Sequence, residues 1–463
     1  MDALNGKRLV ILGLARQGSA LARFAVGVGA HVTLSDLRAA AELKEAVDEL
    51  ADLRPDQIRF VLGEHPITLL DECDMLALSG GVPLDAPFVT EARRRGIPLT
   101  NDSLEFMRRN PAPMIGITGS AGKTTTTALV GAMGHKAGRK TWVGGNIGRP
   151  LIADLANINP GDLVVQELSS FQLEIWGGEE AFAGLAIAAI LNITPNHLDR
   201  HRTMERYAAA KGNLWRAQDS SGIAVLAADD PGVQAVRGLV KGRLRLFSRK
   251  QQVEDGAFVQ DNTIWLSNGR ARRALCPVTE IRLRGAHNIA NTLAAVALAE
   301  STGLPDEAIR QGIRTFSGVP HRLEIVRKLD GVLYVNDSIA TAPERALAAL
   351  EAFDEPVILL AGGRDKNMVW EEWARQVNQR AKHVILFGEL ADRLAGKLNQ
   401  TTATEEPVSI SLADTLAEAV YIAQSEAAAG DVVLLSPGGT SFDGYKDFAE
   451  RGEHFRLLVQ DLN

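Results

Sequence analysis

The chain has 463 residues, of which 46% are hydrophobic and 23% are charged, and its formal net charge is −7. At roughly 150 residues per domain this length predicts about three domains, and the composition is that of a globular protein. The negative net charge argues against a general binder of nucleic acids or of membrane surfaces, since either function needs a positive field.

The two cysteines, Cys73 and Cys276, lie far apart in the sequence. They exclude a disulfide framework and a site that binds metal through cysteine alone, and they are typical of buried thiols in a reducing compartment. No apolar run approaches the roughly 18 residues of a transmembrane helix, and Arg16 interrupts the apolar run near the N-terminus before a signal-peptide core forms. We therefore expect a cytoplasmic protein without membrane insertion.

Two proline-bearing joints divide the chain into three segments. They lie at residues 110–113 and 317–320, where proline disfavours continued helix. The expected domains are residues 1–110, 111–318 and 319–463.

The first segment alternates short apolar runs with helical patterns, which predicts βαβ units around a parallel sheet. Its expected strands cover residues 8–12, 31–35, 75–79 and 97–100, and its expected helices cover 17–28 and 39–51.

The other two segments repeat this α/β pattern. In the middle segment we expect strands at 114–117, 163–167 and 185–191, helices from 123 and over 203–218, and a small antiparallel addition within 244–284. In the third segment we expect strands at 333–336, 357–361, 383–387 and 432–436, and helices at 343–353 and 413–428. Many of these strands end in glycine or polar residues. Since ligands bind beyond the carboxyl ends of strands in open α/β sheets, all three segments are predicted to bind ligands.

A glycine loop is the strongest local signal. It follows the strand expected at 114–117 and precedes a helix, and it comprises Gly119, Ser120, Ala121, Gly122, Lys123, Thr124 and Thr125. Backbone N–H groups of such a loop converge on phosphate oxygens, Lys123 can reach the β- and γ-phosphates, and Thr124 offers a hydroxyl to Mg²⁺. The first glycine of the full P-loop spacing is missing, because Ile117 occupies that position. An ordinary glycine turn at a helix start is the alternative.

Three further residues are candidates for the metal site of a nucleoside triphosphate. Glu167 closes a predicted strand, although it could instead cap the following helix. His197 follows the strand expected at 185–191, although a single histidine is usually structural. Lys211 lies on the apolar face of the helix expected at 203–218. It either extends its ammonium group outward to solvent or is carbamylated near the metal, and the sequence leaves both open.

Asn291 and Arg322 are candidates for nucleotide contacts. Asn288 is expected to cap the Ala-rich helix that follows it, whereas Asn291, one turn later, is not explained by capping. Arg322 lies at the second joint, where it could touch a phosphate or a base, or make only a surface salt bridge.

The start of the first segment resembles a dinucleotide-binding turn. Gly13, Ala15 and Gly18 follow the fingerprint spacing, with alanine in place of the middle glycine, and Asp36 comes 23 residues after Gly13. An acid at that place can hold ribose hydroxyls. The pattern allows NAD(P) or another anionic nucleotide, such as a UDP-sugar.

Taken together, the motifs resemble the Mur ligases of peptidoglycan synthesis over essentially the whole chain. They come closest to the members that add D-glutamate to UDP-N-acetylmuramoyl-L-alanine. The motifs are residues 118–124, 145–148, 167–173, 192–199, 207–211, 321–324 and 336–338, together with His287, Asn288, Asn291, Ser436, Pro437, Ser441 and Phe448. The resemblance implies an α/β protein with a Rossmann-like N-terminal domain, a central P-loop ATPase domain and a Rossmann-like C-terminal domain.

The resemblance also implies an ADP-forming ligase that works through an acyl phosphate, with two Mg²⁺ ions, in a monomer. ATP is implied at Gly119, Ser120, Ala121, Gly122, Lys123, Thr124, Thr125, Asn291, Arg322 and Asp337. The UDP substrate is implied at Leu14, Ala15, Asp36, Arg38, Gly81, Asn146 and Gln172, and glutamate at Thr341, Lys366, Ser441 and Phe448. The implied metal ligands are Thr124, Glu167, His197 and a carbamylated Lys211. The implied catalytic residues are Lys123, His197 and Lys211.

Two positions depart from the family pattern. Ile339 stands where many members have lysine, and Ala342 stands where asparagine is common. The amino-acid pocket is therefore expected to differ, which leaves D- or L-glutamate, or another amino acid, open.

A P-loop switch protein predicts an Asn-Lys-x-Asp motif, which the chain lacks. A two-Rossmann dehydrogenase leaves Gly122–Thr124 unexplained.

Overall fold

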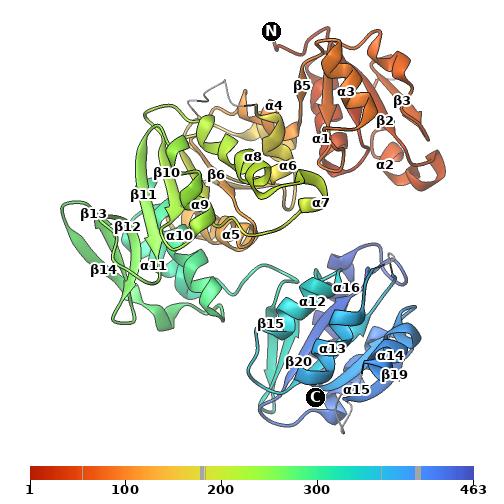
Figure 1. The fold of residues 1–463 in the computed structure, drawn as a ribbon, viewed down its shortest axis with the longest axis vertical. Helices are drawn as coiled ribbons and strands as arrows, with labels where there is room; N and C mark the ends of the chain where they lie inside the picture. Colours follow the sequence, from red (N-terminus) through yellow and green to blue (C-terminus); the bar gives the residue numbers. More distant parts are fainter. Residues whose placement is uncertain (55, 178–181, 183, 366–367, 402–407) are drawn as a thin grey trace. The chain divides into compact units, whose positions relative to one another are not determined.

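The computed structural model describes residues 1–54, 56–177, 182, 184–365, 368–401 and 408–463, and it contains three β-sheets (Figure 1). The chain divides into two compact units. One comprises Met1–Arg282 with Ala286–Phe316, and the other comprises Leu283–Gly285 with Ser317–Asn463. The second predicted joint therefore falls where the second unit resumes, whereas the first joint lies inside one unit. Within the described part of the chain, no helix has the length and apolarity needed to cross a membrane.

The first sheet is parallel and has the order β3-β2-β1-β4-β5. Its strands are β1 (Arg8–Leu12), β2 (His31–Asp36), β3 (Ile58–Leu62), β4 (Met75–Leu78) and β5 (Leu99–Thr100). The helices of this part are α1 (Arg16–Gly27), α2 (Lys44–Asp48), α3 (Pro87–Arg94) and α4 (Asp102–Met107). All four predicted strands are present. The edge strand β3 was not predicted, and the helix expected at 39–51 contracts to α2 with a short 3₁₀ turn before it.

The middle sheet has nine strands in the order β14-β13-β12-β11-β10-β9-β6-β8-β7. They are β6 (Met114–Thr118), β7 (Thr141–Gly145), β8 (Leu163–Glu167), β9 (Ile187–Ile190), β10 (Ile223–Ala227), β11 (Arg243–Ser248), β12 (Asp255–Gln260), β13 (Thr263–Asn268) and β14 (Arg272–Pro277). The helices are α5 (Lys123–Lys136), α6 (Ser170–Ile175), α7 (Leu198–His201), α8 (Met204–Arg216), α9 (Pro231–Ala235), α10 (Ala286–Ser301) and α11 (Asp306–Thr315). The antiparallel addition expected within 244–284 is confirmed as β12–β14.

Helices cover both faces of this middle sheet, so its central strands β6, β8 and β9 are buried along their whole length. The neighbouring residues Val164 and Val165 of β8 pack into different hydrophobic clusters, one with Leu214 of α8 and the other with Leu129 of α5. Strands buried on both faces read as continuous apolar runs, which is why β6, β8 and β9 could be predicted.

The third sheet has the order β15-β16-β20-β17-β18-β19, in which only β15 and β16 pair antiparallel. Its strands are β15 (Glu324–Leu329), β16 (Val332–Asn336), β17 (Val357–Gly362), β18 (Ala381–Phe387), β19 (Ser409–Ala413) and β20 (Val432–Gly438). Its helices are α12 (Pro343–Leu350), α13 (Glu371–Arg380), α14 (Ala391–Gln400), α15 (Leu416–Glu426) and α16 (Phe448–Asp461). The strands that the sequence did not indicate, β15 and β19, lie at the two edges and are only partly buried.

Candidate functional site

Three parallel strands of the middle sheet end side by side and bring the candidate residues together. Strand β6 lies between β8 and β9, with Ile117 opposite Glu167 and Thr118 opposite Ile190. The glycine loop therefore follows the middle strand, Glu167 ends one neighbour, and the segment leading to His197 follows the other. This is the edge where open α/β sheets bind ligands.

The glycine loop is held in a tight turn around Gly122. Gly122 has φ +80, and a Cβ added to it would lie 2.1 Å from the Oδ1 of Asn291. The side chain of Asn192 closes the loop from β9, since its Oδ1 accepts from the Ala121 N–H (2.8 Å) and its Nδ2 donates to the Ala121 carbonyl (3.1 Å). Lys123 Nζ donates to the Gly119 carbonyl at 2.9 Å and to that of Ser120 at 3.3 Å. The loop thus places a lysine ammonium and the N-terminus of α5 together, as a phosphate site requires.

The Asn291 side chain lies beside Gly122, and its predicted contact with the nucleotide stays a prediction, but the capping prediction for Asn288 is wrong. Helix α10 begins at Ala286, so Asn288 lies inside the helix. Its Oδ1 instead accepts from Asn291 Nδ2 at 3.0 Å, which fixes the buried Asn291 amide beside Gly122.

Thr124 and Glu167, two predicted metal ligands, form a buried hydrogen-bonded pair. The Thr124 hydroxyl donates to Glu167 Oε2 at 2.8 Å, and Asn146 Nδ2 donates to Glu167 Oε1 at 2.8 Å. The alternative role of Glu167 as a helix cap is wrong, because Ser169 caps α6. Among the described residues, no three His, Cys, Asp or Glu side chains gather as a metal site. Mg²⁺ usually takes one or two protein oxygens and completes its shell with phosphates and water, so Thr124 and Glu167 fit that ion.

Lys211 is buried against the glycine loop, so its outward extension to solvent is wrong. Lys211 is 1% exposed, its Nζ donates to the Gly119 carbonyl at 2.9 Å, and Thr118 Oγ1 lies 3.4 Å from Nζ. Burial lowers the pKa of Lys211 well below its usual range, and the nearby Lys123 charge lowers it further. Two lysines that share the Gly119 carbonyl repel each other as ammonium ions. Burial and the neighbouring lysine therefore both disfavour the charged form of Lys211.

His197 stands at the start of α7 with a left-handed backbone (φ 53). Its exposed ring packs edge-on against Phe171, with 5.0 Å between ring centroids. The role of His197 as a metal ligand stays a prediction.

Arg200, which the sequence reasoning missed, joins α7 to the first sheet. Its Nη1 donates to the Gly80 carbonyl at 2.7 Å, its Nη2 donates to the Val82 carbonyl at 2.9 Å, and the guanidinium lies 4.0 Å above the centre of the Phe171 ring. The two carbonyls flank Gly81, a predicted contact of the UDP substrate. No sequence signal marked Arg200, because the residues around it look the same as those around any exposed arginine in a short helix.

Asp36 and Arg38, two residues predicted to bind the UDP substrate, form an ion pair after β2. The buried Asp36 carboxylate accepts from the Leu14 N–H (2.8 Å), from the Arg38 N–H (2.9 Å) and from the Arg38 guanidinium (2.8 and 3.1 Å). Burial raises the pKa of Asp36, but the donors from Arg38 and Leu14 outweigh it and lower the pKa to about 2. Asp36 therefore holds the turn at Leu14 and Ala15 as a permanent anion. Ala15 stands before the first turn of α1.

Gln172 is 1% exposed, and its side chain forms hydrogen bonds within the protein. It completes a capping box at the start of α6 with Ser169, and its Nε2 lies 3.5 Å from Asp102 Oδ1 of the first segment. Its backbone carbonyl accepts from Asn101 Nδ2 at 2.9 Å. These contacts hold α6 against α4, and a contact with the UDP substrate stays a prediction.

In the second unit, Asp337 follows β16 and is 4% exposed. It accepts from the Ser436 hydroxyl at 2.9 Å and from the Leu323 N–H at 3.1 Å. Burial raises the pKa of Asp337 to about 7, although the Ser436 and Leu323 donors and the charges of Arg322 and Arg345 oppose the rise. Arg322 and Asp337 are therefore neighbours, whereas Asn291 belongs to the first unit. A shared nucleotide site for the three stays a prediction.

This buried carboxyl group predicts a pH dependence of stability. Since Asp337 binds its proton more tightly in the native state than in the unfolded chain, stability falls as pH rises from about 4 to about 7, by up to about 4 kcal/mol. Asp337→Asn is expected to lose this decline, whereas Asp354→Asn, at an exposed position, keeps it. Urea unfolding at pH 4.5 and pH 8 measures both. Equal pH dependence in wild type and Asp337→Asn would contradict the assignment.

The structure describes three of the four residues that are predicted to bind glutamate. Ser441 is 2% exposed after β20, Phe448 begins α16, and Thr341 lies in the turn after β16. Lys366 lies outside the described residues.

Arg451, a second residue that the sequence reasoning missed, ties the segments of the predicted glutamate residues together. It is fully buried, with Nη2 donating to the Ser338 carbonyl at 2.9 Å and to the Gly439 carbonyl at 3.3 Å, and Nε donating to Ser338 Oγ at 3.0 Å. Burial lowers its pKa to about 10. Arg451 stands on the apolar face of α16 with Phe448 and Phe455. A charged residue on an apolar face was the signal that singled out Lys211, and it would have found Arg451 as well.

The three sheets and the glycine loop define the class: an α/β protein with a P-loop-type site in its middle sheet. Family models match three parts of the chain. They are the MurD-like N-terminal domain of Mur ligases at residues 7–101, the Mur ligase middle domain at 117–299 and the Mur ligase glutamate ligase domain at 321–439. The chain therefore belongs to the Mur ligase family.

Relatives and solved structures agree with this family. The UDP-N-acetylmuramoylalanine–D-glutamate ligases of Pelotomaculum thermopropionicum and Symbiobacterium thermophilum are 40% and 42% identical to the chain, and the alignments cover 98% and 99% of it and 98% of each relative. The UDP-N-acetylmuramate–alanine ligase of Thermotoga maritima shares the fold at a TM-score of 0.58, with 17% identity and coverage of 98% and 99% of the two chains. A pseudomurein peptide ligase of Methanothermus fervidus does so at 0.55, with 18% identity and coverage of 99% and 100%.

Proposed function

We propose that the protein joins D-glutamate to UDP-N-acetylmuramoyl-L-alanine, with hydrolysis of ATP to ADP and phosphate, as a cytoplasmic, monomeric enzyme of peptidoglycan precursor synthesis. One observation carries the proposal. The relatives named for this reaction are about 40% identical along the whole chain, including the first segment, where Asp36 and Arg38 form an ion pair. L-Glutamate or another amino acid is the alternative, because of Ile339 and Ala342.

The proposed division of labour follows the three sheets. Residues 1–110 would bind the UDP end of the substrate, 111–318 would bind ATP, and 319–463 would bind glutamate. Leu14, Ala15, Asp36, Arg38 and Gly81 would contact the UDP moiety, Asn146 would lie near phosphate, and Gln172 would contact the muramyl part. Thr341, Lys366, Ser441 and Phe448 would hold glutamate. Asn291, Arg322 and Asp337 would contact the nucleotide of ATP.

The chemistry needs an activated carboxylate, because oxide is a poor leaving group. A carboxylate oxygen of the alanyl end attacks the γ-phosphorus of ATP, and ADP leaves. The amine of glutamate then attacks the acyl carbon, loses a proton, and expels phosphate. Lys123 and the N–H groups of the glycine loop would hold the transferred phosphoryl group. Thr124, Glu167, His197 and Lys211 would serve two Mg²⁺ ions, which supply positive charge to the phosphoryl oxygens when they are bound.

The state of Lys211 suits a carbamate. Carbamylation joins the neutral ε-amine to CO₂ and releases one proton, and burial lowers the pKa of this amine, which favours the form that reacts. The product is an anion beside Lys123, which would replace repulsion between two lysines by attraction. The carbamate oxygens would also provide hard ligands of the kind that Mg²⁺ prefers.

Omission of each substrate in turn tests the proposed reaction. Phosphate release is expected to require ATP, UDP-N-acetylmuramoyl-L-alanine and glutamate together. With ¹⁸O in the carboxylate of the UDP substrate, one ¹⁸O is expected in the released phosphate. Release at full rate without the UDP substrate, or phosphate free of ¹⁸O, would contradict the acyl-phosphate route.

Arg200 provides a prediction about the UDP substrate. Arg200→Ala is expected to raise the KM for this substrate on the order of 10- to 100-fold, because it removes two charge-assisted hydrogen bonds to the carbonyls that flank Gly81. The KM for ATP is expected to change little, and Arg200→Lys should restore part of the loss. Arg249→Ala, at an exposed position, is the matched control. Equal rises in both KM values would contradict this positioning role.

A further inference from the structure

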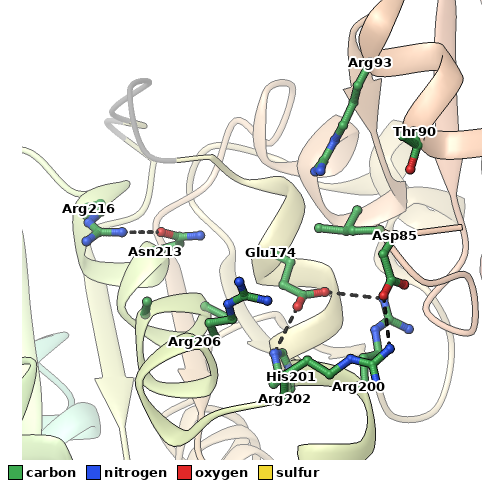
Figure 2. Close-up of a pocket in the computed structure, with 13 residues that line it drawn as sticks. Asp85, Thr90, Arg93, Glu174, Arg200, His201, Arg202, Arg206, Asn213 and Arg216 are labelled. Atoms are coloured by element: carbon green, nitrogen blue, oxygen red, sulfur yellow. Dashed lines mark hydrogen bonds and ion pairs between the residues drawn. The ribbon is translucent and has the colours of Figure 1, made fainter.

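A pocket of about 490 Å³ lies within the first unit, between α3 and the helices α6, α7 and α8 (Figure 2). None of the described residues that line it belongs to the predicted ATP, UDP-substrate, glutamate or metal sites. Its size falls within the range of small-ligand pockets.

The pocket is lined by an excess of arginine. Among the described residues, five arginines line it, namely Arg93, Arg200, Arg202, Arg206 and Arg216, and two carboxylates do so, those of Asp85 and Glu174. The excess is therefore three positive charges, in a protein whose net charge is −7. Such an arrangement needs a local reason, since like charges that face one cavity repel each other.

The carboxylates are already used by two of the arginines. Glu174 Oε2 pairs with Arg200 at 3.4 Å, and Asp85 Oδ2 pairs with Arg202 at 3.2 Å. In the described part of the chain, Arg93, Arg206 and Arg216 have no carboxylate within salt-bridge distance; Arg216 donates to Asn213 Oδ1 at 2.9 Å.. Figure 2 shows Arg93 and Arg206 extending toward the pocket from opposite sides.

We propose that this pocket binds a small polyanion that carries two or more phosphoryl groups. A guanidinium group forms paired hydrogen bonds to phosphate oxygens, and its charge persists over the whole physiological pH range. One phosphoryl group neutralises at most two of the three unmatched charges, whereas a di- or triphosphate can reach guanidinium groups on both sides of the pocket. The pocket shares Arg200 with the loop at Gly81, but binding of the polyanion does not depend on the proposed reaction.

Binding of inorganic tripolyphosphate tests the site by titration calorimetry. The titrations use the full chain with Lys123→Ala, which weakens the phosphate loop, and with UDP at saturation, which fills the proposed uridine site. Adding Arg93→Ala and Arg206→Ala to this background is expected to weaken tripolyphosphate binding at least tenfold, while Arg249→Ala leaves it unchanged. Binding to the background protein should also weaken steeply with added salt.

Both arginines are exposed, so the variants are expected to fold, and their melting temperatures check this. Arg93→Lys with Arg206→Lys should keep part of the affinity, because the charges remain while the paired hydrogen bonds are lost. Equal tripolyphosphate affinity with and without Arg93→Ala and Arg206→Ala would overturn the proposal, and so would an equal loss in Arg249→Ala. Because these titrations involve no turnover, they stand whether or not the proposed reaction is correct.

Discussion

Lys123→Ala is expected to lower ATP-dependent phosphate release on the order of 10³-fold, the size of effect found when one preorganised donor to a reacting group is removed. Lys123 Nζ lies over the glycine loop, 2.9 Å from the Gly119 carbonyl, where the γ-phosphate of a P-loop nucleotide is bound. The measurement is the steady-state rate of phosphate release with all three substrates.

The matched control for this variant is Lys250→Ala, which removes an exposed lysine far along the chain. We expect it to retain the wild-type rate. Unfolding by urea checks that Lys123→Ala remains folded. A rate of Lys123→Ala within about tenfold of wild type would contradict the role of the glycine loop in phosphoryl transfer.

Lys211→Ala is expected to be inactive and to recover part of its activity when acetate or another short carboxylic acid is added. The substitution removes a side chain that is 1% exposed and leaves room beside Tyr207 and Thr118. A small carboxylate that enters this space would replace the two oxygens of the proposed carbamate. The measurement is the rate of phosphate release against the concentration of added acid.

Two controls separate the carbamate from simple repair of packing. Lys211→Arg fills the space with a group that does not react with CO₂, so acid is expected to give no recovery, and Lys123→Ala should likewise not respond. In the wild type, ¹³CO₂ is expected to give a carbamate carbon signal by NMR that Lys211→Ala lacks. Absence of both rescue and this signal would contradict the carbamate and leave the ligase reaction itself untouched.

Much of the fold could be predicted because its central strands are buried on both faces. Strands β6, β8 and β9 are short apolar runs that end in glycine or polar residues, and this pattern fixed both the parallel sheet and the edge that carries the site. The strands that escaped prediction at the sheet edges, such as β3, β15 and β19, are half-exposed. Their burial patterns do not separate them from loops.

The parts of the candidate site that could be predicted are those whose residues lie close together in the sequence. Gly122, Lys123 and Thr124 lie in one motif, and the structure adds the Glu167 partner of Thr124 through the pairing of β6 with β8. The sequence could not decide whether Lys211 extends to solvent, because that depends on how α8 packs on the glycine loop. Arg200 was missed for the same reason, since its partners Gly80 and Val82 lie about 120 residues away in the sequence.

The most direct test of the proposed function is an amino-acid panel with ATP and UDP-N-acetylmuramoyl-L-alanine, read as the mass of the UDP product. The account predicts one added glutamyl residue with D-glutamate, release of one phosphate for each product formed, and little product with other amino acids. Product with L-glutamate in place of D-glutamate would contradict the stereochemistry, and absence of product with both glutamates would contradict the proposed function.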